Sequence, residues 1–184
     1  MTPAPASGSA SGSREGDLVE LVSSDGRTTG STTVLDAHTA PGQLHRAFSV
    51  LIFDPAGRTL LQQRAAVKTR FPLRWANACC GHPAPGAPVA TAAATRLAEE
   101  LGVSGLTLNE VGRYTYQAFD PETGLVEHEY DHVLVARAPA DLVIKPDPAE
   151  VAQVEWVPGE ALLALEDPSH APWLAGVLSI ALGH

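Results

Sequence analysis

The sequence predicts an α+β or layered α/β fold in which a sheet is flanked by helices. Three observations support this prediction: strand-like apolar segments come first, one strongly periodic helix interrupts them, and further helices end the chain. The 184 residues are 45% hydrophobic and 18% charged, which suits one globular domain with a sizeable core. We therefore expect residues 17–184 to form a single domain.

The N-terminal residues 1–16 consist mostly of proline, alanine, glycine and serine. Such a segment cannot bury enough apolar surface to offset the entropy lost on ordering, so it is expected to be a disordered tail. Residues 18–22 (LVELV) predict a first strand. The Asp25-Gly26 pair that follows favours a hairpin turn.

The middle of the chain contains two paired strands, a long loop and a helix. Residues 46–53 (RAFSVLIF) predict a buried strand, and residues 59–64 (TLLQQR) predict its partner after the turn DPAGR. Residues 66–88 are expected to form a long, loop-rich segment. Residues 88–101 predict a helix that ends at Gly102 as its C-cap.

The C-terminal part returns to strands before ending in helices. Residues 111–119 and 125–136 predict two strands around the turn DPETG, and residues 150–157 predict a short strand. A helix is expected to begin after Pro158, and residues 172–182 predict a second, apolar helix.

The overall charge excludes several classes of function. A net charge of −9 and a pI near 5.1 argue against non-specific nucleic-acid binding, which requires a basic surface. No apolar run reaches the length of a membrane-spanning helix, and the N-terminus lacks the basic-then-apolar order of a secretory signal. We therefore expect a cytoplasmic protein whose two cysteines are free thiols.

Those two cysteines are adjacent, in the stretch Cys79-Cys80-Gly81-His82-Pro83. Two cysteines cannot build a cysteine-only zinc site, which needs three or four sulfurs. Each is therefore either a small buried apolar side chain, the more common fate of a free cysteine, or a reactive thiol.

Charged residues gather at three places. Five of the twelve basic residues lie between Arg58 and Arg74, where they form either a solvated loop or a clamp for an anion such as phosphate. Glu99 and Glu100 end the predicted helix, where adjacent carboxylates repel each other and oppose the helix dipole unless a cation is near.

The third place is the strand-like segment VEHEYDHVLV, in which Glu127 and Glu129 point to the same face. The pair is stable if it faces solvent, or if a metal ion or basic groups neutralise it. His128 and His132 fall on the opposite face. The chain has seven histidines, which favours a divalent-metal site with mixed nitrogen and oxygen ligands.

Residues 81–103, GHPAPGAPVATAAATRLAEELGV, resemble a Nudix box at Gly81, Leu97, Glu99, Glu100, Gly102 and Val103. Ala87 stands in a glutamate position of the box and Thr95-Arg96 in its Arg-Glu positions. Two glutamates of the box are therefore missing, which argues against hydrolysis. Residues 35–181 resemble type I isopentenyl-diphosphate delta-isomerases. This resemblance rests on the ordered stretches AHT, LHRAF, LLQQRAAVK, WANACCGHP, LAEELG, YQAFDPETGLVEHE and PWL.

The resemblance implies a layered α/β/α Nudix-like fold and an isomerase that interconverts isopentenyl and dimethylallyl diphosphate. It implies that Cys80 and Glu127 transfer protons on opposite faces of the substrate. Tyr116 would assist near that glutamate, although it stands one residue further from it than in the usual bacterial pattern. Trp173 would stabilise the cationic intermediate through its π face.

The resemblance also implies two cations and a set of basic contacts. A divalent metal (Mn, Mg or Zn) would be held by His38, His45, His82, Glu127 and Glu129. Magnesium held by Glu100 and the Cys80 backbone would bridge to the substrate diphosphate, which Arg64, Lys68 and Arg96 would contact. The expected partner is a small prenyl diphosphate, bound by a monomer or weak homodimer.

Two other functions are compatible with the sequence. One is a Nudix diphosphohydrolase acting on nucleotide-like diphosphates, and the other is a non-enzymatic protein that binds a prenyl diphosphate or a partner. The isomerase pattern has one further departure at Val34, where many bacterial relatives have a lysine. One diphosphate contact is therefore missing or supplied from elsewhere in the chain.

Overall fold

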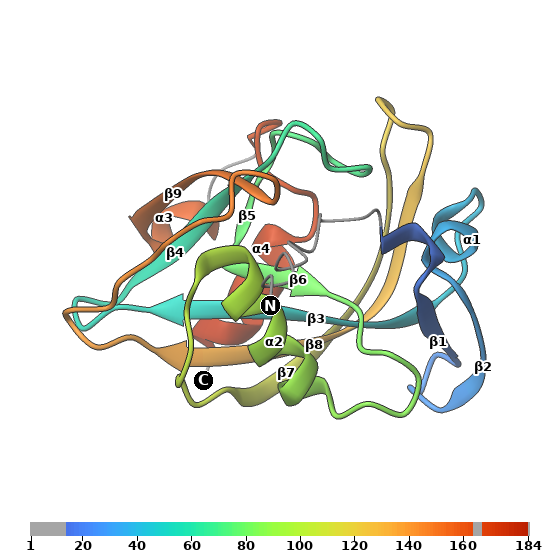
Figure 1. The fold of residues 1–184 in the computed structure, drawn as a ribbon, viewed down its shortest axis with the longest axis horizontal. Helices are drawn as coiled ribbons and strands as arrows, with labels where there is room; N and C mark the ends of the chain where they lie inside the picture. Colours follow the sequence, from blue (N-terminus) through green and yellow to red (C-terminus); the bar gives the residue numbers. More distant parts are fainter. Residues whose placement is uncertain (1–13, 164–166, 184) are drawn as a thin grey trace, which may run out of the picture.

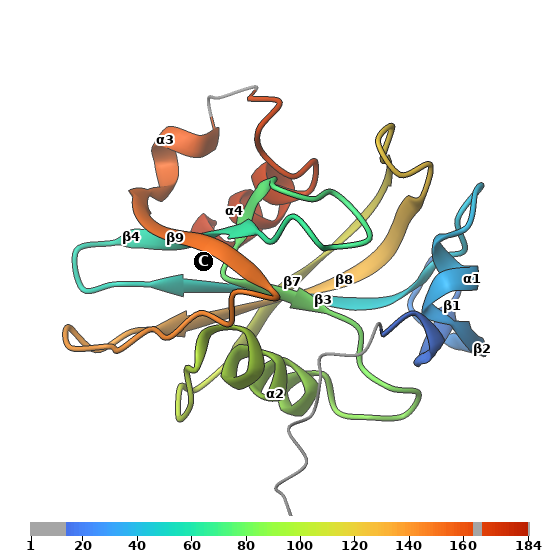
Figure 2. The same ribbon diagram turned by 45° about the horizontal axis from the view of Figure 1, so that its top comes forward.

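A curled mixed sheet forms the centre of the molecule, and helices cover both of its faces (Figure 1; Figure 2). The computed structural model describes residues 14–163 and 167–183. Helix α2 (Val89–Leu101) lies on one face, whereas α3 (Gly159–Leu163) and α4 (Leu174–Leu182) lie on the other. The predicted α+β fold, a mixed sheet with flanking helices, is confirmed.

The strands follow the sequence patterns closely where those patterns are long. They are β1 (Leu18–Val22), β2 (Thr28–Thr33), β3 (His45–Phe53), β4 (Arg58–Arg64), β5 (Trp75–Asn77), β6 (Cys79–Gly81), β7 (Asn109–Phe119), β8 (Val126–Arg137) and β9 (Val151–Pro158). A short helix, α1 (Val34–His38), connects β2 to β3, and a 3₁₀ turn, η1 (Arg14–Gly16), precedes β1.

Strand β3 is the centre of the sheet. It runs parallel to β8, with His45 opposite Glu129 at one end and Phe53 opposite Arg137 at the other. It is also antiparallel to β6, where Ser49 lies opposite Cys80. Strand β3 is buried along almost its whole length, as expected for a strand covered by helices on both faces. This arrangement brings β3, β6 and β8 together at the start of β3.

The predicted helix α2 packs through residues spaced four apart, Ala93, Leu97 and Leu101, which belong to the same buried cluster as Phe48 of β3. Gly102 adopts the left-handed conformation with φ 63°, and its N–H donates to the carbonyl of Ala98. The predicted glycine C-cap is therefore confirmed. Among the residues that the structure describes, no helix is long and apolar enough to cross a membrane.

The structure differs from the expected organisation at two places. The loop-rich segment at residues 66–88 also contains β5 and β6, because strands of three residues are too short to carry a readable period. The predicted disordered tail is wrong for Arg14–Gly16, which form η1. Two residues of this turn have ion-pair partners, since Arg14 pairs with Glu99 at 2.8 Å and Glu15 pairs with Arg70 at 2.9 Å. The rest of that predicted tail, residues 1–13, and residues 164–166 of the predicted helix after Pro158 lie outside the described residues.

Candidate functional site

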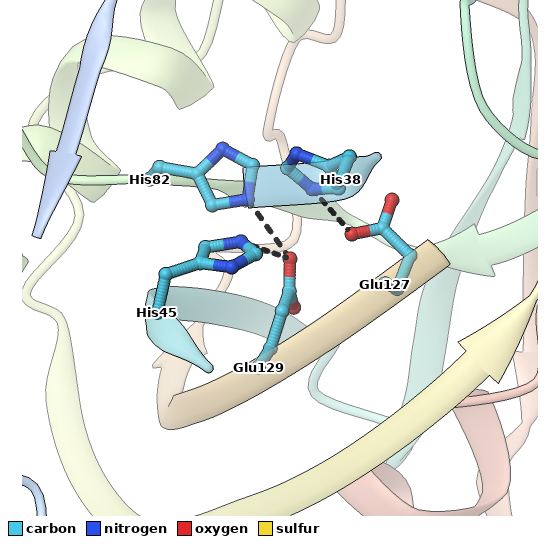
Figure 3. Close-up of side chains that lie close together, drawn as sticks. All are labelled: His38, His45, His82, Glu127 and Glu129. Carbon is cyan, nitrogen blue, oxygen red and sulfur yellow. Dashed lines mark hydrogen bonds and ion pairs between the residues drawn. The ribbon is translucent and has the colours of Figure 1, made fainter. Parts of the chain in front are cut away.

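Five side chains from four segments meet at the start of β3 (Figure 3). One donor atom from each lies within 4.8 Å of the others, and the residues are His38, His45, His82, Glu127 and Glu129. We call this set the five-donor cluster. All five were expected at one site, and the structure brings them together. His128 and His132 lie outside the cluster, as the strand alternation of β8 predicts.

The backbone fixes which ring nitrogens face the cluster. His38 donates from Nδ1 to the Val34 carbonyl at 2.6 Å, and His45 donates from Nδ1 to the Gln43 carbonyl at 2.8 Å. Nε2 of each ring therefore faces the cluster. A neutral imidazole has one N–H, so Nε2 of the His45 ring, which burial keeps neutral near pH 7, presents a lone pair there.

The lone pair of His45 faces a carboxylate oxygen rather than a donor. His38 Nε2 lies 2.8 Å from Glu127 Oε2, and His45 Nε2 lies 3.8 Å from Glu129 Oε1 and has no hydrogen-bond partner among the described residues. Acceptor groups that face each other in a buried place are unfavourable unless a cation lies between them. The donor set therefore fits a divalent metal ion.

The electrostatics of the cluster lead to the same conclusion. Burial and the neighbouring His38 lower the pKa of His45 to about 4, so its ring is neutral near pH 7. Burial and the charge of Glu127 raise the pKa of Glu129 well above its usual value. Burial also opposes ionisation of Glu127, but His38 and Arg70 outweigh it and hold the pKa of Glu127 well below its usual value. A bound dication would stabilise both carboxylates in their charged form.

Metal binding should therefore stabilise the fold. A divalent cation at about 100 times its Kd is expected to add about 2.7 kcal/mol to the free energy of unfolding. This corresponds to a rise of about 5–10 °C in the melting temperature for a chain of this size, measurable by calorimetry. His45→Ala should abolish the rise, whereas His128→Ala, the control on the opposite face of β8, should keep it. A rise of equal size in both variants would contradict a metal site here.

A cavity of about 360 Å³ opens beside the five-donor cluster. His82, Glu127 and Glu129 form part of its wall. Six other side chains expected at the site also line it, namely Arg64, Lys68, Cys80, Arg96, Tyr116 and Trp173, whereas Glu100 does not. The sequence therefore predicted nine of the 21 described residues that line the cavity.

The two cysteines have different environments. Cys79 is fully buried in the core under α2, whereas Cys80 lines the cavity. The Cys80 thiol donates to Asn77 Oδ1 at 3.2 Å and contacts Ser49 Oγ at 3.6 Å. Burial and the charge of Asp131 raise the pKa of Cys80 to about 12, so the thiol keeps its proton near neutral pH.

Tyr116 contacts a different carboxylate from the one expected. Its hydroxyl donates to Glu129 Oε2 at 2.7 Å, and not to Glu127, the glutamate near which it was expected to act. The register between β7 and β8 explains the difference, because Tyr116 lies directly opposite Glu129 and Ala118 lies opposite Glu127.

Trp173 forms an apolar wall at the start of α4 and is 2% exposed. Its ring packs edge-on against Phe71 at 5.4 Å and lies 5.9 Å from the Tyr116 ring. The Arg64 guanidinium lies 5.6 Å from the centre of the indole ring. The ring can therefore accommodate positive charge in its vicinity. Arg64 itself donates to the carbonyls of Arg70 and Phe71.

The other basic side chains are paired with carboxylates. Arg96 forms ion pairs with Glu99, Glu100 and Glu150, and Lys68 pairs with Glu150. Arg96 is thus the cation that relieves the repulsion between Glu99 and Glu100. Glu100 is 2% exposed and lies outside the five-donor cluster, so the structure does not bring it to the same metal position.

Sequence reasoning missed three residues near the site. Arg70 donates to Glu127 Oε1 at 3.2 Å and to Glu15 at 2.9 Å, although it was counted only as part of a basic run. Asp131 is fully buried, and burial raises its pKa to about 8. Strand alternation could have found Asp131, because it follows Glu129 by two residues. Nothing in the sequence pattern pointed to Asn77, which accepts the Cys80 thiol.

Comparisons with known proteins identify a domain family and several relatives of the chain. A NUDIX domain model matches residues 43–177. The chain is 64% identical over 167 residues to an isopentenyl-diphosphate Delta-isomerase of Nocardia farcinica, covering 89% of this chain and 93% of the relative. It is 47% identical over 183 residues to an isopentenyl-diphosphate Delta-isomerase of Streptomyces coelicolor, covering 98% of this chain and 92% of the relative.

Solved structures support the fold. A Deinococcus radiodurans protein superposes with a TM-score of 0.70 at 19% identity, covering 89% of this chain and 98% of that one. A MutT NUDIX hydrolase from Burkholderia pseudomallei superposes with a TM-score of 0.58 at 20% identity, covering 74% of this chain and 97% of that one. At these identities the likeness concerns the fold alone.

Proposed function

The chain belongs to the type I isopentenyl-diphosphate delta-isomerase family of the Nudix superfamily, and we propose that it interconverts isopentenyl diphosphate and dimethylallyl diphosphate. One observation at the site supports this proposal. The Cys80 thiol and the hydrogen-bonded Tyr116–Glu129 pair line the same cavity, next to an apolar aromatic wall. A double-bond shift requires two proton-transfer groups in such a place.

The proposed reaction moves one proton onto the terminal alkene carbon and takes another from C2. The first group gives up its proton, and the second accepts one. Since the reaction is reversible, each group acts as an acid in one direction and as a base in the other. We assign these roles to Cys80 and Glu129. The Tyr116 hydrogen bond supports Glu129 over Glu127, the glutamate expected from the sequence.

The walls of the cavity would protect the intermediate. Between the two proton transfers the branched carbon carries positive charge, and water would capture it. Trp173 would exclude water and stabilise that charge through its π face. The nearby Tyr116 and Phe71 rings hold the indole in place.

We propose that the five-donor cluster holds Mn²⁺ or Zn²⁺ in preference to Mg²⁺. Three imidazole nitrogens suit the first two ions, whereas Mg²⁺ prefers oxygen ligands and retains several waters. The bound metal would neutralise the two carboxylates and orient Glu129. Elemental analysis of protein purified without added metal, followed by competition between the three ions, tests this preference.

The diphosphate is proposed to bind at Arg64, Lys68 and Arg96. Phosphate oxygens would draw Lys68 and Arg96 away from their present carboxylate partners. Glu100 would then be released to hold a magnesium ion that accompanies the diphosphate.

A cytoplasmic location and a monomeric or weakly dimeric state complete the proposal. Cell fractionation tests the location, and sedimentation of the purified protein tests the oligomeric state.

An assay of the purified protein with isopentenyl diphosphate and a divalent metal tests the function. The expected product is an acid-labile allylic diphosphate. Release of inorganic phosphate or a monophosphate would instead indicate the hydrolase alternative, and no product at all would indicate a binding protein. The Ala87 and Arg96 positions argue against hydrolysis, because they lack the carboxylates with which Nudix hydrolases hold magnesium.

A further inference from the structure

Asn77 is fully buried behind two residues that line the cavity. It ends β5 and lies directly before the Ala78 link to β6. Its Oδ1 accepts two hydrogen bonds, one from the Cys80 thiol at 3.2 Å and one from Trp173 Nε1 at 3.1 Å. A single amide oxygen therefore contacts both the proposed proton-transfer sulfur and the proposed aromatic wall.

The orientation of this amide follows from the chemistry of its partners. Indole N–H is only a donor, so the amide atom that faces Trp173 must be the oxygen. The opposite end of the amide lies 2.9 Å from the carbonyl of Cys79 and 3.2 Å from the carbonyl of Val50. Carbonyls only accept, so this end must be the NH₂ group. The thiol beside Oδ1 must then donate its hydrogen to it.

The two ends of the side chain have different kinds of partner. The NH₂ group binds main-chain carbonyls of β3 and β6, which hold the amide rigidly within the sheet. The oxygen binds only side chains, and both of these face the cavity. A role confined to holding β5 against its neighbours would need only the first set of contacts.

We infer that Asn77 is a positioning residue that fixes the Cys80 thiol and the Trp173 indole relative to each other across the substrate cavity. This inference rests on the proposed isomerase function. The sulfur must meet a carbon of the substrate, and the indole must face the charged carbon next to it. A misplacement of about 1 Å at a reacting group can lower a rate by about 100-fold.

Two substitutions separate this role from a structural one. Asn77→Asp keeps an oxygen acceptor for the thiol and the indole but loses the NH₂ group. Asn77→Leu is of similar size and loses both ends. Both variants should therefore melt below the wild-type temperature, since both lose the amide donors to the two carbonyls.

Catalysis should distinguish the variants below their melting transitions. Asn77→Leu is expected to lower kcat by about 100-fold with little change in the KM for isopentenyl diphosphate. Asn77→Asp, which keeps an oxygen acceptor, should avoid most of this loss and have a kcat within about tenfold of the wild-type value. If Asn77→Leu does not fold, Asn77→Ser, whose hydroxyl is too short to replace the amide oxygen, takes its place in the comparison.

Thr59→Val is the matched control, because Thr59 is a fully buried polar residue at the far end of β4. It should leave kcat unchanged. Two outcomes would overturn the inference. One is an equal loss of kcat in Asn77→Asp and in Asn77→Leu or its replacement Asn77→Ser. The other is a wild-type kcat in the variant that lacks the amide oxygen. A wild-type protein that produces no dimethylallyl diphosphate would refute the proposed function directly, and the inference would fall with it.

Discussion

Replacing Cys80 with alanine is expected to lower kcat by about 1,000-fold, within the range usually contributed by a proton-transfer group. The substituted side chain cannot carry a proton, and no other described thiol lines the cavity. Substrate affinity should change little, because the proposed diphosphate contacts are Arg64, Lys68 and Arg96. Steady-state kinetics, together with a direct binding measurement of isopentenyl diphosphate, separate the two effects.

Cys79→Ala is the matched control for that experiment. Cys79 is fully buried in the core under α2 and does not line the cavity. Removing its sulfur should lower the free energy of unfolding by about 1 kcal/mol and leave kcat near the wild-type value. An inactive Cys79→Ala beside an active Cys80→Ala would reverse the roles of the two cysteines.

Features of the site that depend on local periodicity could be predicted from the sequence. Alternation along a strand placed Glu127 and Glu129 on one face and His128 on the other, and the structure has this arrangement. The glycine that ends α2 could be predicted for a similar reason, since few other residues adopt a left-handed conformation without strain. These rules need only the identities of neighbouring residues.

Features that depend on how distant segments align could not be predicted in the same way. The partner of Tyr116 is set by the register of β7 against β8, and a shift by two residues would have placed it opposite Glu127. Asn77 has a role only because α4 brings Trp173 back to the end of β5, after a separation of 96 residues. The Arg14–Gly16 turn likewise has its ion-pair partners at distant positions, Glu99 and Arg70.

Glu129→Gln is expected to lower kcat by about 1,000-fold, because the amide has nearly the same shape but cannot exchange a proton. Glu129 also belongs to the five-donor cluster, so loss of metal could produce the same result. Metal content must therefore be measured in the same preparations, with metal restored where it is low. If Glu127→Gln is inactive with metal restored while Glu129→Gln is active, Glu127 is the proton-transfer glutamate.

Tyr116→Phe tests the same assignment without disturbing a metal ligand. The hydroxyl lies outside the five-donor cluster and donates to Glu129 Oε2, so its removal should lower kcat by about 10- to 100-fold at unchanged metal content. Tyr114→Phe is the matched control, since the Tyr114 ring stacks on Tyr116 at 5.5 Å but its hydroxyl has no contact with Glu129 in the described structure. If both variants retain full activity, the hydrogen bond to Glu129 does not take part in proton transfer. In that case the choice between the two glutamates depends on the glutamine variants alone.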